Sequence, residues 1–117
     1  MLGEDNVDEE SGVSEIYLQA RVQLKYGKLG EFMKQMETIV PMLESKGWKL
    51  IGSWHTLVGN LAEVVDLWEV DDANHVAMEI IDQVNGVDKA FSEAYPALFD
   101  LIDVETLSLM RKTTFSP

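Results

Sequence analysis

Residues 52–68 form the segment that most restricts the fold of this chain. They read Gly-Ser-Trp-His-Thr-Leu-Val-Gly-Asn-Leu-Ala-Glu-Val-Val-Asp-Leu-Trp, with a β-prone run on each side of Gly59-Asn60. Glycine and asparagine readily adopt the backbone conformations of a tight hairpin connection. The segment therefore predicts two antiparallel strands, over residues 48–57 and 62–70.

The periodicity of apolar residues predicts the other elements. Residues 15–25 alternate between apolar and polar side chains, which indicates a strand with one apolar face. Apolar residues at helical spacing predict a helix from Leu29, kinked or interrupted at Pro41 and ending at Gly47. Two shorter helical stripes meet at Asn85-Gly86, the second ending near Pro96 or shortly after, and a last strand covers 102–112. This order predicts an α+β, ferredoxin-like βαββαβ fold with an antiparallel four-stranded sheet.

The acidic residues are concentrated at the N-terminus. Residues 3–12 carry five carboxylates, no basic residue and almost no apolar side chain. Such a segment buries too little apolar surface to offset the entropy lost on ordering. We therefore expect a flexible acidic leader over residues 1–14 and one domain over residues 15–117.

Composition excludes several classes of function. The net charge of −12 disfavours partners that present phosphates, so neither nucleic acid nor an anionic membrane is expected. Cysteine is absent, and the two histidines lack the spacing of a metal-binding pair, so no metal site is predicted. No motif for a bound cofactor is present. Without a membrane-spanning run or a signal-like N-terminus, the chain is expected to be cytoplasmic.

Helices on one face of a four-stranded sheet leave the other face uncovered. On the first strand that face carries Tyr17, Gln19 and Arg21. The remaining strands are expected to add some of Trp48, Trp54, Val64, Trp68 and Leu107. Burial of one tryptophan covers roughly 150–250 Å², or about 4–6 kcal/mol of gross burial. We therefore expect two sheets to pair face to face in a homodimer.

The hairpin also carries a resemblance. The pattern Gly-Ser-Trp-x-Thr-x-x-Gly-x-Leu-x-x-Val-Val-x-Leu-Trp over residues 52–68 resembles the signature of the NIPSNAP family. The closing Phe115-Ser116-Pro117 resembles the ending of many members, and the element order agrees over residues 15–117. The resemblance implies a dimeric α+β barrel, in which two sheets enclose a shared lumen, and it implies no agreed catalytic residues. Members often carry histidine before the Leu-Trp pair, where this chain has Asp66.

Two hairpin residues are candidates for catalysis. If the strand register pairs His55 with Asp66, the carboxylate would orient the imidazole and raise its basicity, as in a general base. A structural hydrogen bond, or no contact, is the alternative. A carboxylate inside an apolar run needs a partner, and Arg21 is the most suitable one. The predicted ligand-binding set in the barrel lumen, which could equally be a water-filled dimer seam, comprises Tyr17, Gln19, Arg21, Trp54, Asp66 and Trp68.

These features leave alternative functions open. The first is a NIPSNAP-like protein that binds a small ligand in the lumen or acts through protein contacts. The second is a cofactor-independent or haem-using monooxygenase of the same fold, and the third is a purely structural dimerisation module. Haem-degrading monooxygenases of this fold use an asparagine, a tryptophan and a histidine. Trp68 and His75 resemble the last two, and Gln19 stands on the first strand instead of asparagine. A capping or surface role for His75 is the alternative.

Overall fold

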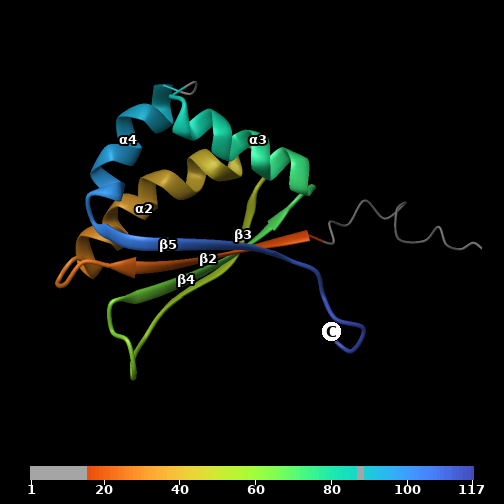
Figure 1. The fold of residues 1–117 in the computed structure, drawn as a ribbon, viewed down its shortest axis with the longest axis horizontal. Helices are drawn as coiled ribbons and strands as arrows, with labels where there is room; N and C mark the ends of the chain where they lie inside the picture. Colours follow the sequence, from red (N-terminus) through yellow and green to blue (C-terminus); the bar gives the residue numbers. More distant parts are fainter. Residues whose placement is uncertain (1–15, 87–88) are drawn as a thin grey trace, which may run out of the picture.

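The computed structural model describes residues 16–86 and 89–117 as one sheet with helices on one side (Figure 1). The predicted leader over residues 1–14 lies outside the described residues. The strands are β2 (Ile16–Leu24), β3 (Lys49–His55), β4 (Glu63–Val70) and β5 (Ile102–Met110). The helices are α2 (Leu29–Glu44), α3 (Ala73–Val84) and α4 (Lys89–Phe99).

The sheet has the strand order β3-β4-β2-β5, and every neighbouring pair is antiparallel. The first strand therefore lies inside the sheet, with the β3–β4 hairpin on one side and the last strand on the other. This arrangement confirms the predicted ferredoxin-like fold. The second helical region is divided into α3 and α4, as the Asn85-Gly86 break predicts.

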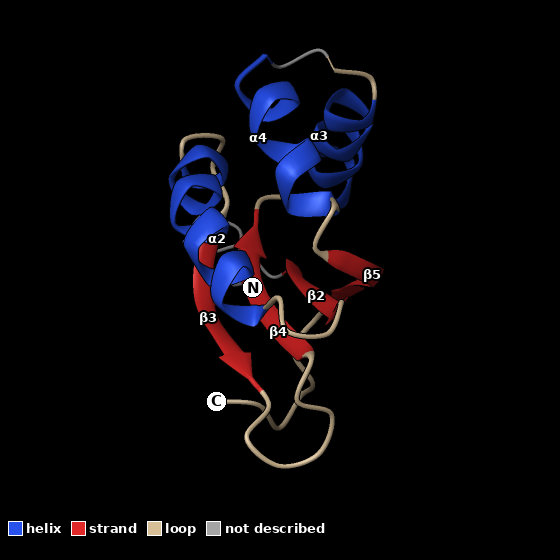
Figure 2. Cartoon of the chain, turned by 90° about the vertical axis from the view of Figure 1, so that its left-hand side faces the viewer, coloured by secondary structure: helices blue, strands red, loops and turns tan. Residues whose placement is uncertain are grey.

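The alternation in β2 decides which side chains lie beneath the helices. Leu18, Ala20 and Val22 are buried, whereas Arg21 between them is exposed. Because successive side chains of a strand point to opposite faces, the polar residues of β2 occupy the face that the described helices leave uncovered (Figure 2). The sheet thus has one face packed against α2, α3 and α4 and one open face.

Tryptophan contributes to the core differently from expectation. Trp48 and Trp68 are buried beneath the helices and meet edge to face, with ring centroids 5.9 Å apart and planes at 70°. Val64 is buried on the same face, and Leu107 pairs with Ala20, which places it there too. Of the predicted open-face set, Trp54 is the residue that lies there, opposite Val65 and 57% exposed.

The two helix prolines are accommodated within their helices. α2 passes through Pro41 to Glu44, and α4 passes through Pro96 to Phe99, so neither proline ends its helix. The turn after α2 instead depends on Gly47, whose φ of 96° is costly for other residues. Among the described residues, no helix is both long and apolar enough to cross a bilayer.

Candidate functional site

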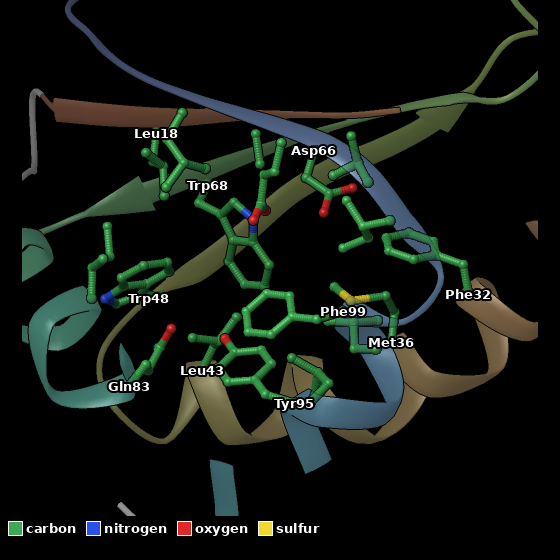
Figure 3. A pocket seen from close by; sticks show the side chains of 18 residues that line it. Leu18, Phe32, Met36, Leu43, Trp48, Asp66, Trp68, Gln83, Tyr95 and Phe99 are labelled. Atoms are coloured by element: carbon green, nitrogen blue, oxygen red, sulfur yellow. The ribbon is translucent and has the colours of Figure 1, made fainter. Parts of the chain in front are cut away.

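A cavity of about 180 Å³ lies between the sheet and the helices (Figure 3). The sheet supplies its floor, and α2, α3 and α4 supply its walls. Eighteen residues line it, and most are apolar. They are Leu18, Ala20, Val22, Phe32, Met36, Ile39, Leu43, Trp48, Asp66, Trp68, Ile80, Gln83, Tyr95, Leu98, Phe99, Ile102, Glu105 and Leu107.

Aromatic rings form much of the cavity wall. The indole of Trp68 extends from β4 toward the helices, where Tyr95 and Phe99 of α4 face it (Figure 3). The Tyr95 and Phe99 rings stack, with centroids 5.1 Å apart. Trp48 lines the cavity beside them, and its buried indole nitrogen has no hydrogen-bond partner within the described residues. A buried donor without a partner usually costs about 1–3 kcal/mol.

Asp66 places a carboxylate in this apolar wall. It follows the burial pattern of β4, in which alternate residues lie beneath the helices, and it is only 4% exposed. Its neighbour across the hairpin is Ser53, whose hydroxyl donates a hydrogen bond to the carboxylate. Burial raises the pKa of Asp66, and the Ser53 hydrogen bond partly offsets that rise. The structure therefore holds Asp66 as a carboxyl group that is harder to ionise than usual.

Glu105 brings a second carboxyl group to the same cavity. It lies on β5 opposite Val22, so it shares the helix-covered face of the sheet. β5 is an edge strand, and Glu105 is an exposed residue there although it also lines the cavity. Burial raises the pKa of Glu105, and the negative charge of Asp66 raises it further. Burial and the charges of Glu105 and Glu79 likewise raise the pKa of Tyr95, so its phenol stays protonated.

Gln83 adds an amide from α3. Its side-chain nitrogen donates to Glu79 at 3.4 Å, and the other oxygen of Glu79 lies 3.8 Å from Nζ of Lys46. Glu79 is 7% exposed and the Lys46 side chain is 29% exposed, so this contact is partly shielded from water. The ion pair links α3 to the chain that follows α2, and the hydrogen bond links the Gln83 side chain to the same glutamate.

A second hollow, of about 470 Å³, lies between α2 and the β3–β4 hairpin. Ser53 and His55 line it from the helix-covered face of β3, and Trp54 between them borders it from the edge strand. Asp66 lines both this hollow and the cavity beneath the helices, as do Phe32 and Met36. Asp66 therefore stands at the partition between the two spaces.

The predicted ligand-binding set divides between the two faces of the sheet. Asp66 and Trp68 lie beneath the helices, whereas Tyr17, Gln19 and Arg21 lie on the open face. Trp54, paired with Val65, joins the open-face group. The expectation that these six residues surround one lumen is wrong. Gln19 and Arg21 pair with Leu67 and Val65 of β4, and these two residues alternate with Asp66 and Trp68. Alternate residues of a strand point to opposite faces, so Asp66 and Trp68 lie on the other face of the sheet.

The predicted contact of Arg21 with Asp66 is wrong for the same reason. Arg21 pairs with Val65 across the sheet and donates to Glu63 at 3.0 Å on the open face. Asp66 pairs with Ala20 and takes its hydrogen bond from Ser53.

His55 does share a face with Asp66. It lies opposite Val64, two residue pairs along the hairpin from Ser53 and Asp66. Both residues line the hollow beside α2, and the hydrogen-bond donor that the structure gives Asp66 is Ser53. A joint catalytic role for His55 and Asp66 stays a prediction.

His75 lies in the first turn of α3, away from the cavity lining. Its backbone N–H donates to the capping carboxylate of Asp72 at 2.8 Å. Its Nδ1 atom lies 3.6 Å from a carboxylate oxygen of Asp71. Trp68 lines the cavity, but Gln19 lies on the other face of the sheet. The three residues compared with haem-degrading monooxygenases therefore do not converge on one space.

Six polar or aromatic cavity residues escaped the sequence-based set: Phe32, Trp48, Gln83, Tyr95, Phe99 and Glu105. Glu105 carried a usable signal, because it shares the parity of Leu107 and Leu109 on an alternating strand. Glu105 is therefore an acidic residue on the strand face that its apolar neighbours predict to be buried. Asp66 stands out on β4 for the same reason. No sequence signal marked Tyr95 or Gln83, because their helices reach the cavity only through tertiary packing.

Comparisons with known proteins agree with this fold. The NIPSNAP family model matches residues 17–117. A NIPSNAP family protein with unknown function from Agrobacterium tumefaciens is 23% identical, with 87% of this chain and 91% of that chain covered at a TM-score of 0.76. An uncharacterized NIPSNAP domain protein from Burkholderia xenovorans is 20% identical, covering 87% and 98% at 0.73.

The fold also extends to oxygenases. SnoaB, a cofactor-independent oxygenase from Streptomyces nogalater, is 13% identical, with 88% of this chain and 99% of that chain covered at a TM-score of 0.63. At this identity the likeness concerns the fold alone. A search of curated protein sequences finds no significant match.

Proposed function

This chain belongs to the NIPSNAP family, and we propose that it binds a small ring-containing molecule in the cavity between its sheet and its helices. The observation that carries the proposal is the buried carboxylate of Asp66 at the wall of an otherwise largely apolar cavity. A buried carboxylate costs stability unless its charge is well compensated. Ionisable groups with raised pKa values in a cavity are concentrated at functional sites.

The size of the cavity limits the ligand. An engineered apolar cavity of about 150 Å³ in another protein binds benzene. The cavity here is about 180 Å³, which suits one six-membered ring with a short substituent. Rings of Trp68, Tyr95 and Phe99 border this space and offer the surfaces on which another ring packs (Figure 3). The proposed site thus lies within each chain, rather than in a lumen between two sheets.

A homodimer remains part of the proposal. The open face of the sheet has apolar residues at its centre, Val65 and Leu67, with Trp54 beside them on β3. The Arg21–Glu63 ion pair lies on the same face. The described helices all cover the opposite face, so a second sheet could pack here and bury these residues. Sedimentation at micromolar concentration tests this: a particle of 13.2 kDa would refute the dimer.

Ligand binding is tested by blocking the cavity from its floor. Single-ring alcohols and phenols are titrated while the fluorescence of the cavity tryptophans and the thermal midpoint are followed. Ala20→Val adds two carbons to a residue that lines the cavity, and we expect it to weaken binding about tenfold or more. Ala77→Val, on the exposed side of α3, is the matched control and should bind normally. Equal binding by both variants would exclude the cavity as the site.

The buried carboxylate of Asp66 supports a second candidate function, that of a cofactor-independent oxygenase. A carboxylate with a raised pKa in an apolar wall is suited to accept the proton of a phenol or enol substrate, which dioxygen would then oxidise. Oxygen uptake with single-ring hydroquinones tests this function. Protein-dependent uptake that Asp66→Asn abolishes would support it. Uptake equal to the spontaneous rate would refute it and leave binding as the function.

A further inference from the structure

The charged groups at the cavity are of one sign. Asp66 and Glu105 line it, and none of the eighteen lining residues is a lysine, arginine or histidine. Within the described part of the chain, the ion pairs of the structure involve other carboxylates, such as Glu63 and Glu79. The two acidic groups therefore line one largely apolar space in which no lining residue is a cation that could balance their charges.

Their hydrogen-bonding capacity is only partly used. A carboxylate can accept about four hydrogen bonds, and the Ser53 hydroxyl donates one to Asp66. The negative charge of Asp66 also opposes ionisation of Glu105. A bound cation would relieve this repulsion and supply N–H donors to both groups, because charge-assisted hydrogen bonds to carboxylates are stronger than neutral ones.

The aromatic walls favour the same type of ligand. The faces of tryptophan and tyrosine rings attract cations, and they also pack against apolar rings. The Trp68 indole extends from the sheet toward the helices. Asp66 lies near its sheet end, and the stacked Tyr95 and Phe99 rings lie near its helix end (Figure 3). A ring compound with an ammonium substituent can therefore place the ammonium group near the carboxylates and its ring against the aromatic side chains, all within the cavity.

From this arrangement we infer that the cavity selects a primary ammonium compound built on a single ring, with the ammonium group held by Asp66 and Glu105. The inference rests on the proposed binding function and names its ligand class. Anionic ligands of the same size are excluded, because each would face two acidic groups and no base.

Three probes of nearly equal size separate charge from shape. Benzylamine, benzyl alcohol and benzoate carry charges of +1, 0 and −1 on the same ring at neutral pH. Titration calorimetry at pH 7 should give affinity in the order benzylamine, benzyl alcohol, benzoate. We expect benzylamine to bind at least about tenfold more tightly than benzyl alcohol, the usual effect of one or two charged hydrogen bonds.

Matched variants assign the effect to the two carboxylates. Asp66→Asn and Glu105→Gln should each weaken benzylamine binding about tenfold and change benzyl alcohol binding less than about threefold. Glu69→Gln removes an acid from the open face, opposite Tyr17, and should change neither. Ala20→Val should weaken both about tenfold or more, which separates cavity binding from attraction to an acidic surface.

Each outcome decides a different claim. Benzyl alcohol or benzoate binding as tightly as benzylamine would overturn the ammonium preference and leave the proposed binding function intact. Benzylamine binding that survives Ala20→Val would place the amine on the surface and would also overturn it. Absence of binding by all three probes would overturn the proposed function itself.

Discussion

Ala20→Val probes whether the cavity is empty space above the sheet. Ala20 is 5% exposed and lies at the centre of β2, directly between Asp66 on β4 and Leu107 on β5. All three residues line the cavity. Valine at this position adds two carbons on the helix-covered face, where the cavity of about 180 Å³ offers room for them.

The expected stabilisation follows from the buried carbons. Each buried methylene contributes about 0.8 kcal/mol, so the two carbons give an upper estimate of about 1.6 kcal/mol. Valine also fits a pleated strand better than alanine. The added methyls further desolvate the Asp66 carboxylate, which lowers the gain. We expect the free energy of unfolding to rise by about 1 kcal/mol.

Urea unfolding followed by tryptophan fluorescence measures this change. The variant and the wild type are compared at equal protein concentration, because the stability of a homodimer would depend on concentration. A gain of 1 kcal/mol corresponds to a rise of about 4–8 °C in Tm for a domain of this size. Ala77→Val, exposed on α3, should leave stability unchanged or slightly reduced.

A fall in the free energy of unfolding of Ala20→Val would refute the reasoning. Overpacking of a filled core usually costs about 1–3 kcal/mol. A loss of that size in Ala20→Val would show that neighbours already occupy the space over Ala20. A gain in stability with unchanged ligand affinity would instead separate the cavity from the binding site.

Three other predictions follow from the same geometry. Because burial raises the pKa of Asp66, its protonated form stabilises the fold fully below the ordinary value of 3.8, and this contribution is lost as the pH rises through the raised folded pKa. Asp66→Asn should therefore gain stability relative to wild type as the pH rises toward 7 in urea titrations, and a difference independent of pH would contradict the assignment. Leu67→Lys, at the centre of the open face, should convert the proposed dimer to monomer in sedimentation with little change in far-ultraviolet circular dichroism; an intact dimer would place the interface elsewhere. Haem added to wild type and to His75→Ala should give the same Soret spectrum, because His75 does not line the cavity; a band lost in the variant would contradict this geometry.

The fold itself was largely predictable from local patterns. The alternation of β2 distinguished its buried from its open face, and the glycine-asparagine hairpin joined β3 to β4 as expected. The break at Asn85-Gly86 separated α3 from α4. These features depend on backbone conformation and on periods of two and 3.6 residues, and residues close together in the sequence determine both.

The candidate site was less predictable, because the run from Val64 to Trp68 is apolar on both parities apart from Asp66. Either face of β4 could therefore have packed beneath the helices. The irregularity between Leu50 and Gly52 shifts the register of β3, so the parity of this strand could not be counted directly from the sequence. The predicted site mixed residues of both faces as a result.

The sequence by itself determined the elements, their order, the family and the two sides of β2. Only the tertiary structure decided that Asp66 and Trp68 lie beneath the helices while Arg21 lies on the open face. It also brought Glu105 and Tyr95, far away in sequence, to the same cavity as Asp66. The physical reason is that periodicity records which residues share a face, whereas the packing of one element on another chooses the buried face and the neighbours that meet there.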